Sequence, residues 1–220
     1  MKSHMSKLDD ANRLLDAGQF SKARELFSAL IVDVESAPLI KGRARLGEVR
    51  ALIGLGNFEE AIDLIERIFE DKKQQVQPNL RPYFFHERAR IADFQGNRHD
   101  AIAYYREELL HLSSSMPHYF RRLAENYIRQ GTIFLELGER ENCEIYLRLA
   151  RDYADRVTSE KAYADMLTLK ARCLEEDGEL SKALNLLCEA RDLYITDGLF
   201  YESATADKRI ADVRCRMERG

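Results

Sequence analysis

The sequence lacks several features that would define a membrane, secreted or nucleic-acid-binding protein. No apolar run approaches the roughly 20 residues that a membrane-spanning helix needs. Its first residues do not show the basic start, apolar core and small-residue cleavage site of a secretory signal. The formal net charge is -4 over 220 residues, so the basic excess typical of general nucleic-acid binders is missing. We therefore expect a cytoplasmic protein with neither a membrane nor a nucleic acid as its partner.

Metal and catalytic patterns are also absent. The four cysteines (Cys143, Cys173, Cys188 and Cys215) form no C-x-x-C pair, and no two histidines stand at metal-ligand spacing. A chain this long with so few cysteines does not predict a disulfide framework, so we interpret them as small apolar core residues in a reducing compartment. Some histidines neighbour carboxylates, as in His86-Glu87 and His99-Asp100, but no nucleophile or oxyanion feature accompanies them. We expect no cofactor, no metal and no enzymatic activity.

What the sequence does contain is a repeat. Glycines fall at positions 18, 56, 96, 138 and 178, with gaps of 38, 40, 42 and 40 residues. Pro38 and Pro78 each lie 18 residues before the next of these glycines. Glycine ends helices because it adopts a left-handed backbone cheaply, and proline begins them because its missing N–H costs nothing in the first turn. The shared period predicts repeated units of helix, tight turn and helix.

Apolar residues on both sides of these turns recur at helical spacing. Leu46, Val49 and Ile53 form one stripe before Gly56, and Ile62, Ile65 and Ile68 continue the pattern after it. Alternating strand patterns are absent. The remaining predicted helices cover residues 80–95, 98–113, 118–137, 140–156, 159–177, 180–195 and a closing helix at 199–217, with linkers at 75–79 and 113–117.

Small residues keep fixed distances from each glycine. Five residues after the glycines stand Ala23, Ala61, Ala101, Cys143 and Ala183, and seven residues before them stand Ala11, Val49, Ala89, Gly131 and Ala171. We predict that these positions face each other across each hairpin and let the two backbones approach closely. A single hairpin cannot bury its apolar stripe, so the hairpins should stack.

This pattern resembles the tetratricopeptide repeat family. The resemblance rests on Gly56-Asn57-Phe58 with Ala61, on Gly18 with Phe20 and Ala23, on Gly178 with Leu180 and Ala183, and on "GNRHDAIAYY" at 96–105. It covers about residues 5–195, with a period near 40 in place of the usual 34. The family's leucine eight before the glycine is replaced by polar residues at every repeat.

The resemblance implies a fold and a domain organisation. The expected fold is an all-α right-handed superhelix, or α-solenoid, of about five helix-turn-helix repeats followed by a C-terminal capping helix. We interpret residues 1–4 as a cloning remnant and residues 5–220 as a single domain of this kind.

The resemblance also implies a function. In this family the first helix of each pair lines a concave face that holds protein partners, so the chain is expected to be a non-enzymatic interaction module for an extended peptide or a partner helix. Carried over to this sequence, the partner-binding residues are Asn12, Arg43, Leu46, Arg50, Tyr83, His86, Arg90, Phe94, Arg129 and Arg172. The partner is expected to be a protein or peptide with acidic or carboxylate groups.

Two questions stay open at the level of sequence. Arg50, Arg90 and Arg172 occupy one repeat position, where they either grip a partner's carboxylates and carbonyls or pair internally with Glu87, Asp93, Glu175 and Glu176. Two alternatives to partner binding on the concave face remain. One is a self-associating scaffold, which would form a homo-oligomer through its repeat ends, and the other is a peptide-sensing regulatory domain of a longer regulator.

Overall fold

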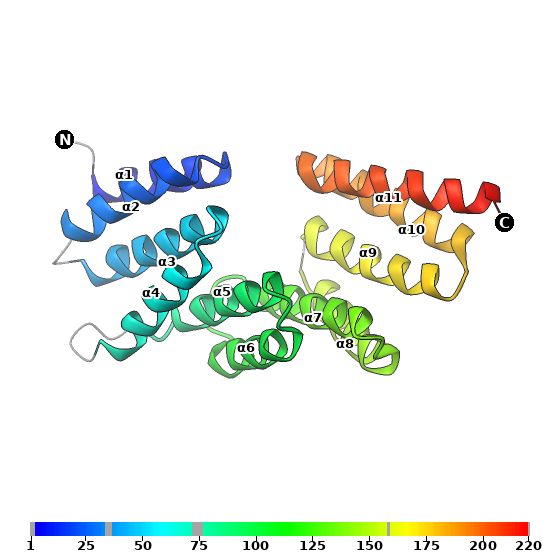
Figure 1. Cartoon of the computed structure of the whole chain (residues 1–220), viewed down its shortest axis with the longest axis horizontal. Helices are drawn as coiled ribbons and strands as arrows, with labels where there is room; N and C mark the ends of the chain where they lie inside the picture. The colour runs from blue at the N-terminus through cyan, green and yellow to red at the C-terminus, as the bar shows by residue number, and fades with distance from the viewer. Residues whose placement is uncertain (1–2, 34–36, 72–76, 158, 220) are drawn as a thin grey trace. The chain divides into compact units, whose positions relative to one another are not determined.

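The structure is a computed structural model that describes residues 3–33, 37–71, 77–157 and 159–219. These residues form eleven α-helices and contain no strand (Figure 1), which confirms the all-α helical repeat fold. Residues 1–2 of the expected remnant and residues 75–76 of the expected linker lie outside the described ranges.

The helix bounds follow the sequence expectation closely. In chain order the helices are α1 (His4–Asp16), α2 (Phe20–Asp33), α3 (Pro38–Gly54), α4 (Phe58–Glu70), α5 (Arg81–Phe94), α6 (Arg98–His111), α7 (Tyr119–Glu136), α8 (Arg140–Ala154), α9 (Glu160–Glu176), α10 (Leu180–Thr196) and α11 (Phe200–Arg219).

Each hairpin turns at one of the five periodic glycines. Their φ angles lie between 70° and 79°, a backbone conformation that glycine adopts without strain. The residue after each glycine donates its N–H to the carbonyl five positions earlier, as Asn57 does to Leu52 at 2.9 Å. This bond closes the helix end in a Schellman motif. Gly198, with φ 72°, makes the same turn between α10 and α11, although it lies outside the 40-residue period.

The two prolines of the predicted period behave differently. Pro38 begins α3, as predicted. Pro78 does not begin a helix, because residues 78–80 form a turn in which Leu80 donates its N–H to the carbonyl of Gln77 at 2.8 Å. The helix starts at Arg81, so Pro82 occupies the first-turn position in its place.

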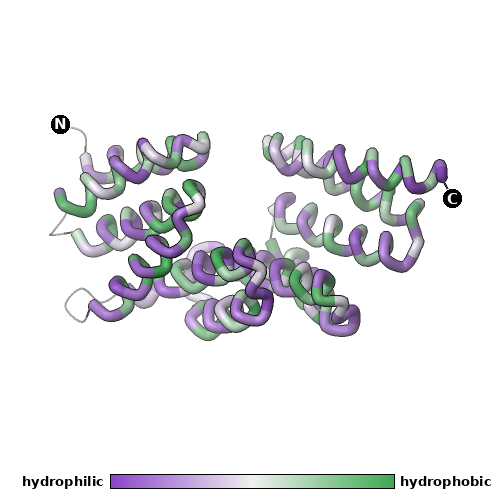
Figure 2. The backbone as a smooth tube through the Cα atoms, in the orientation of Figure 1, coloured by the Kyte–Doolittle hydropathy of each residue, from purple (hydrophilic) through white to green (hydrophobic). Residues whose placement is uncertain are grey.

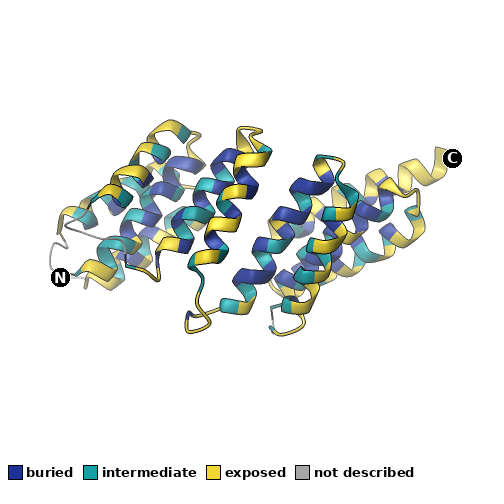
Figure 3. Cartoon of the chain, turned by 90° about the horizontal axis from the view of Figure 1, so that it is seen from below, coloured by how far each residue is buried: buried dark blue, intermediate teal, exposed yellow. Residues whose placement is uncertain are grey.

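The small residues that were predicted to face each other are buried in every hairpin. Ala11, Val49, Ala89 and Ala171 before the glycines, and Ala23, Ala61, Ala101, Cys143 and Ala183 after them, are all fully inaccessible. A Cβ placed on Gly131 in α7 would lie 3.7 Å from the carbonyl oxygen of Cys143 in α8, so these helices do meet there. Hydrophobic and hydrophilic residues are interspersed along every helix (Figure 2). The buried residues lie on the helix faces that pack against neighbouring helices (Figure 3).

The chain divides into two compact units, residues 1–113 and 114–220. In the first unit, α3 packs against α1 and α2, and α5 packs against α3, α4 and α6. Its cores include a cluster around Phe27 between the first two hairpins and a cluster around Phe84 between the second and third. Each added hairpin therefore covers the apolar face of the one before it, which is the stacking that the repeat predicts.

The second unit contains the hairpins α7/α8 and α9/α10 and the closing helix α11. Helix α9 packs against α7, α8 and α10, and α11 packs against α10. Ile210 and Val213 of α11 join Ala171, Ala183 and Leu187 in one buried cluster. The closing helix thus covers the α9/α10 hairpin as expected, while the prediction of one domain over residues 5–220 stays a prediction.

Candidate partner-binding site

Two of the three predicted arginines meet at one buried carboxylate in the first unit. Arg50 of α3 donates its Nε–H to Oε1 of Glu87 at 2.7 Å, and Arg90 of α5 donates from Nη1 to Oε2 of the same residue at 2.7 Å. Glu87 lies one helical turn before Arg90, and it faces α3 because its helix packs there. We call Arg50, Glu87 and Arg90 the arginine–glutamate cluster.

The carboxylate of the cluster is ionised although it is 1% exposed. Burial by itself would raise the pKa of Glu87, but the positive charges of Arg50 and Arg90, with a further contribution from His86, outweigh burial and lower this pKa from 4.5 to about 2. The two guanidinium groups are held in place by this charge, yet about a third of each arginine side chain stays exposed. Each guanidinium has five N–H donors, so each keeps donors beyond the one bonded to Glu87.

A second polar pair lies beside the cluster. Nδ1 of His86 lies 2.9 Å from Oε2 of Glu108, a residue of α6 that is fully buried. The imidazole also meets the Tyr105 ring edge to face, with 5.5 Å between the ring centroids. The predicted site residue His86 is therefore a link between the two helices of its hairpin, with 12% of its side chain exposed.

The apolar residues of the predicted site divide into core and surface. Leu46 is buried in the cluster around Phe84, and Tyr83 is partly buried against the same cluster. Phe94 is 61% exposed, stacks on Phe58 with 5.9 Å between centroids, and carries the Arg90 guanidinium 5.7 Å from its own centroid. Of these three residues, Phe94 offers the most surface to a partner.

The other predicted residues do not join the arginine–glutamate cluster. Asn12 on α1 and Arg43 on α3 are exposed. Arg129 and Arg172 belong to the second unit, where Arg172 donates to Glu136 of α7 at 3.3 Å. Internal pairing therefore occurs for Arg50, Arg90 and Arg172, with Glu87 as an expected partner and Glu136 as an unexpected one.

Sequence reasoning missed the burial of Glu87 and the part played by Glu108. Glu108 stands twelve residues after Gly96, a position that holds Leu30, Ile68, Ala150 and Ala190 in the other hairpins. His86 stands ten residues before the same glycine, where the first two hairpins have Leu8 and Leu46. Comparing the repeats position by position would have shown that an apolar pair is replaced by a polar one in the third hairpin.

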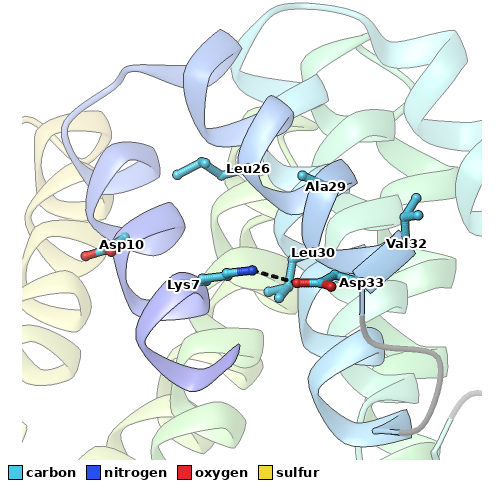
Figure 4. A pocket seen from close by; sticks show the side chains of 7 residues that line it. All are labelled: Lys7, Asp10, Leu26, Ala29, Leu30, Val32 and Asp33. Carbon is cyan, nitrogen blue, oxygen red and sulfur yellow. Dashed lines mark hydrogen bonds and ion pairs between the residues drawn. The ribbon is translucent and has the colours of Figure 1, made fainter. Parts of the chain in front are cut away.

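A groove opens on the first hairpin, between α1 and α2 (Figure 4). It encloses about 1030 Å³ and is lined by Lys7, Asp10, Leu26, Ala29, Leu30, Val32 and Asp33. The Lys7 ammonium points across it to Asp33, at 2.6 Å. The equivalent positions of the second hairpin hold another ion pair, Arg45 with Asp71 at 3.8 Å. Val32 is 79% exposed and Leu26 41%, which makes this groove an apolar surface with a charged edge.

A smaller pocket of about 440 Å³ lies in the second unit among α9, α10 and α11. Arg172, Tyr194 and Arg209 are among its lining residues. Tyr194 donates its hydroxyl to Asp165 at 2.6 Å, and Arg209 donates to Glu175 at 2.6 Å. The polar groups at this pocket are therefore largely satisfied within the chain.

Neither a membrane span nor a metal cluster is found in the part of the chain that the structure describes. None of its helices combines the length and the apolar character needed to cross a membrane. The described residues also bring together no group of three histidine, cysteine, aspartate or glutamate side chains that could hold a metal ion.

Comparison with known proteins agrees with this geometry. The profile of the tetratricopeptide repeat family matches residues 8–74, which span the first two hairpins. Residues 8–74 are therefore similar to tetratricopeptide repeats. No curated protein sequence matches it.

Solved structures share the fold of this chain at low sequence identity. A thermophilic TPR protein of Thermus thermophilus is 17% identical with a TM-score of 0.65, over 97% of this chain and 100% of that one. A Rap protein complexed with Competence and Sporulation Factor is 20% identical with a TM-score of 0.67, over 98% and 61%. A signal transduction ATPase with a tetratricopeptide repeat sensor, from Pyrococcus horikoshii, is 15% identical with a TM-score of 0.76, over 98% and 35%.

Proposed function

We propose that this chain is a protein-interaction module that acts by binding and not by catalysis, and that it holds an extended peptide segment of a partner along the first helices of its hairpins. The observation that carries the proposal is the arginine–glutamate cluster. It presents two partly exposed guanidinium groups from consecutive repeats, fixed by one buried carboxylate. A pair of donors spaced by one repeat suits the regular carbonyls of an extended chain.

The charge and rigidity of the cluster favour an acidic partner. Two arginines and one ionised glutamate leave a net charge of +1 at its surface, and the charge of the buried carboxylate cannot be approached directly from solvent. A guanidinium binds a carboxylate through two parallel N–H···O bonds, which a lysine cannot do. Because Glu87 already restrains both arginines, binding loses less side-chain entropy than it would with free arginines.

Phe94 extends the proposed binding surface with apolar contact. Its ring is exposed and lies against the Arg90 guanidinium, so a partner side chain placed on the ring would also lie near the positive charge. Aromatic residues and arginine are enriched among the residues that contribute most of the binding free energy at protein interfaces. Asn12, Arg43 and Tyr83 remain proposed contacts that contribute less, whereas buried Leu46 would act through the packing of α3. Arg129 and Arg172 are proposed as separate partner contacts on the second unit.

The fold relatives support a module of this kind. The Rap protein was solved in complex with Competence and Sporulation Factor, and the archaeal ATPase carries its tetratricopeptide repeats as a sensor. The chain spans 61% and 35% of those two proteins. A binding module that works inside a larger regulator is therefore a version of the same proposal.

The test uses an array of synthetic 15-residue peptides of acidic, neutral and basic composition, each with a free and an amidated C-terminus. We expect the chain to select acidic peptides, and the combined Arg50→Lys and Arg90→Lys variant to bind them about tenfold more weakly, because lysine loses the bidentate bonds. Lysine keeps the positive charge next to Glu87, so the fold should survive, which circular dichroism checks. Arg67→Lys on the second helix α4 is the matched control. Equal affinity of the double variant and the control would reject the proposal.

The exposed groove of the first hairpin favours a second candidate function, self-association. Val32 and Leu26 expose apolar surface next to Lys7 and Asp33, so the groove carries both charge signs and can be complementary to a second copy of itself. We expect Val32→Lys to lower the apparent mass in sedimentation at high concentration if copies dock there. A wild-type mass that stays monomeric at every concentration rejects this candidate and leaves peptide binding untouched.

A further inference from the structure

Two cysteine side chains meet in the second unit. Cys143 lies in α8 and Cys173 in α9, and their sulfur atoms are 3.5 Å apart. Both are free thiols and both are buried, at 0% and 2% exposure. Cys188 and Cys215 are more accessible. The two buried sulfurs therefore touch each other across consecutive hairpins, at a distance that a small movement of the side chains would close to a bond.

The repeat shows that sulfur is not required for packing at these positions. Cys143 stands five residues after Gly138, and Cys173 five residues before Gly178. The same two positions of earlier hairpins hold Ala23 with Ala51, and Ala61 with Ile91, all of them buried. Neighbouring hairpins therefore pack together at these positions with alanine or isoleucine in place of cysteine. Two thiols at these positions thus add a capacity for oxidation that the packing of the fold does not require.

The surroundings of the two thiols make them unequal. Arg140 donates from Nη1 to the carbonyl oxygen of Cys173 at 2.7 Å, and its charge lies close to both sulfurs. The hydrogen bond with Cys143, helped by the charge of Arg140 and opposed by burial, lowers the pKa of the Cys173 thiol. The same hydrogen bond, together with burial, raises the pKa of the Cys143 thiol. Cys173 is accordingly the more readily ionised of the two thiols, and the thiolate is the reactive form.

We propose that Cys143 and Cys173 form an oxidative modification site, at which a hydroperoxide joins the two thiols in an intrachain disulfide between α8 and α9. Cys173 first loses its proton, and its thiolate attacks one peroxide oxygen of hydrogen peroxide, so that an S–O bond forms, the O–O bond breaks and the leaving hydroxide takes up that proton as water. The resulting sulfenic acid is attacked by the Cys143 sulfur, whose proton passes to the departing hydroxide as water. The net reaction takes two thiols and one hydrogen peroxide to one disulfide and two waters.

The disulfide would tie one repeat to the next. Helices α8 and α9 belong to different hairpins, so the bond closes a loop that includes the connection between them. Cross-linking restricts the unfolded chain more than the folded one, and the second unit should therefore melt at a higher temperature when oxidised. The proposal does not depend on which partner the first unit binds.

The experiment uses the full chain with Cys188→Ser and Cys215→Ser, so that only the buried pair can react. On treatment with one equivalent of hydrogen peroxide, we expect the intact mass to fall by 2 Da, a peptide map to link residues 143 and 173, and the melting temperature to rise by about 5 °C or more. Dithiothreitol should reverse all three changes.

The control adds Cys143→Ala to that background, a substitution that the repeat itself makes at Ala23 and Ala61. This variant should fold, show no loss of 2 Da and gain oxygen at Cys173. Two outcomes would overturn the proposal. One is a gain of 16 or 32 Da without a cross-link when both cysteines are present. The other is a disulfide that forms only in denaturing urea, since the folded helices would then be keeping the sulfurs apart.

Discussion

The Nε–H of Arg50 in the second hairpin donates to the carboxylate of Glu87 in the third hairpin at 2.7 Å. The bond ties consecutive repeats of the first unit together through a charge that is removed from water. Because buried carboxylates are costly unless they are paired, this contact links the stability of the stack to the placement of the arginines that we propose for binding.

The first prediction concerns the removal of that buried charge. Glu87→Gln keeps the shape of the side chain but leaves the two arginines without their counter-charge, and we expect it to destabilise the first unit by about 1–3 kcal/mol. Denaturant unfolding followed by circular dichroism measures the loss. Glu60→Gln, which removes the exposed partner of Arg24, should cost less than about 1 kcal/mol. Equal losses for the two variants would contradict the account of Glu87.

The second prediction concerns pH. The folded-state pKa of Glu87, about 2, lies below its ordinary value of 4.5, so the folded state favours the ionised form. The stability that this carboxylate contributes is fully present above pH 4.5 and is lost as the pH falls from 4.5 through about 2. The difference in unfolding free energy between the wild type and Glu87→Gln should therefore be constant from pH 7 to about pH 5. It should then shrink on further acidification, and a difference that disappears already near pH 6 would show that another group is responsible.

The third prediction tests the polar pair of the third hairpin. His86→Leu alone takes the imidazole away from buried Glu108 and should destabilise the chain by about 3 kcal/mol. Adding Glu108→Leu gives an apolar pair like Leu8 with Leu30 of the first hairpin, and the double variant should lose less stability than the sum of the two single losses. A double-mutant cycle from denaturant unfolding measures the coupling. Simple addition of the two single losses would rule the pairing out.

The fourth prediction separates two uses of glycine in the second hairpin. A Cβ on Gly47 would overlap the ring of buried Phe27, so Gly47→Ala should cost about 1–3 kcal/mol by overpacking. Gly56→Ala meets no atom within 4 Å but places alanine at φ 77°, and it should cost about 1–2 kcal/mol through the backbone alone. Replacing the ring by a smaller side chain with Phe27→Leu should recover part of the stability that Gly47→Ala loses and none of the stability that Gly56→Ala loses. Equal rescue of both would mean that the cause is not steric.

Much of the fold could be predicted from the sequence because its determinants are local. A glycine that needs positive φ and an alanine that allows close packing act within one hairpin, and both recur at fixed spacing. Gly198 follows Gly178 by only 20 residues and so falls outside the period, but the predicted break between the helices at 180–195 and 199–217 does fall on it. Pro78 was misread, since Pro82 also stands near the helix start and sequence spacing alone does not choose between them.

The site was harder to predict because its contacts join helices that are distant in sequence. Glutamate is normally exposed, and only the packing of α5 and α6 places Glu108 inside the hairpin, opposite His86. Internal pairing was one of the two alternatives for Arg172, and the candidate glutamates near it in sequence were Glu175 and Glu176, because residues three or four apart on a helix often pair. In the structure Arg172 instead donates a hydrogen bond to Glu136 of the preceding hairpin.

The most direct measurement of the binding proposal is photo-crosslinking from single surface positions. A benzoylphenylalanine is placed at Phe94, 61% exposed and in contact with Arg90, or at Leu110, 76% exposed on the second helix of the same hairpin. Each variant is irradiated with the acidic peptide that the array selects, and the adducts are counted by mass spectrometry. The account predicts adducts from position 94 that disappear with Arg50→Lys and Arg90→Lys, and few from position 110. Adducts that form mainly from position 110, or that persist in the lysine variant, would contradict it.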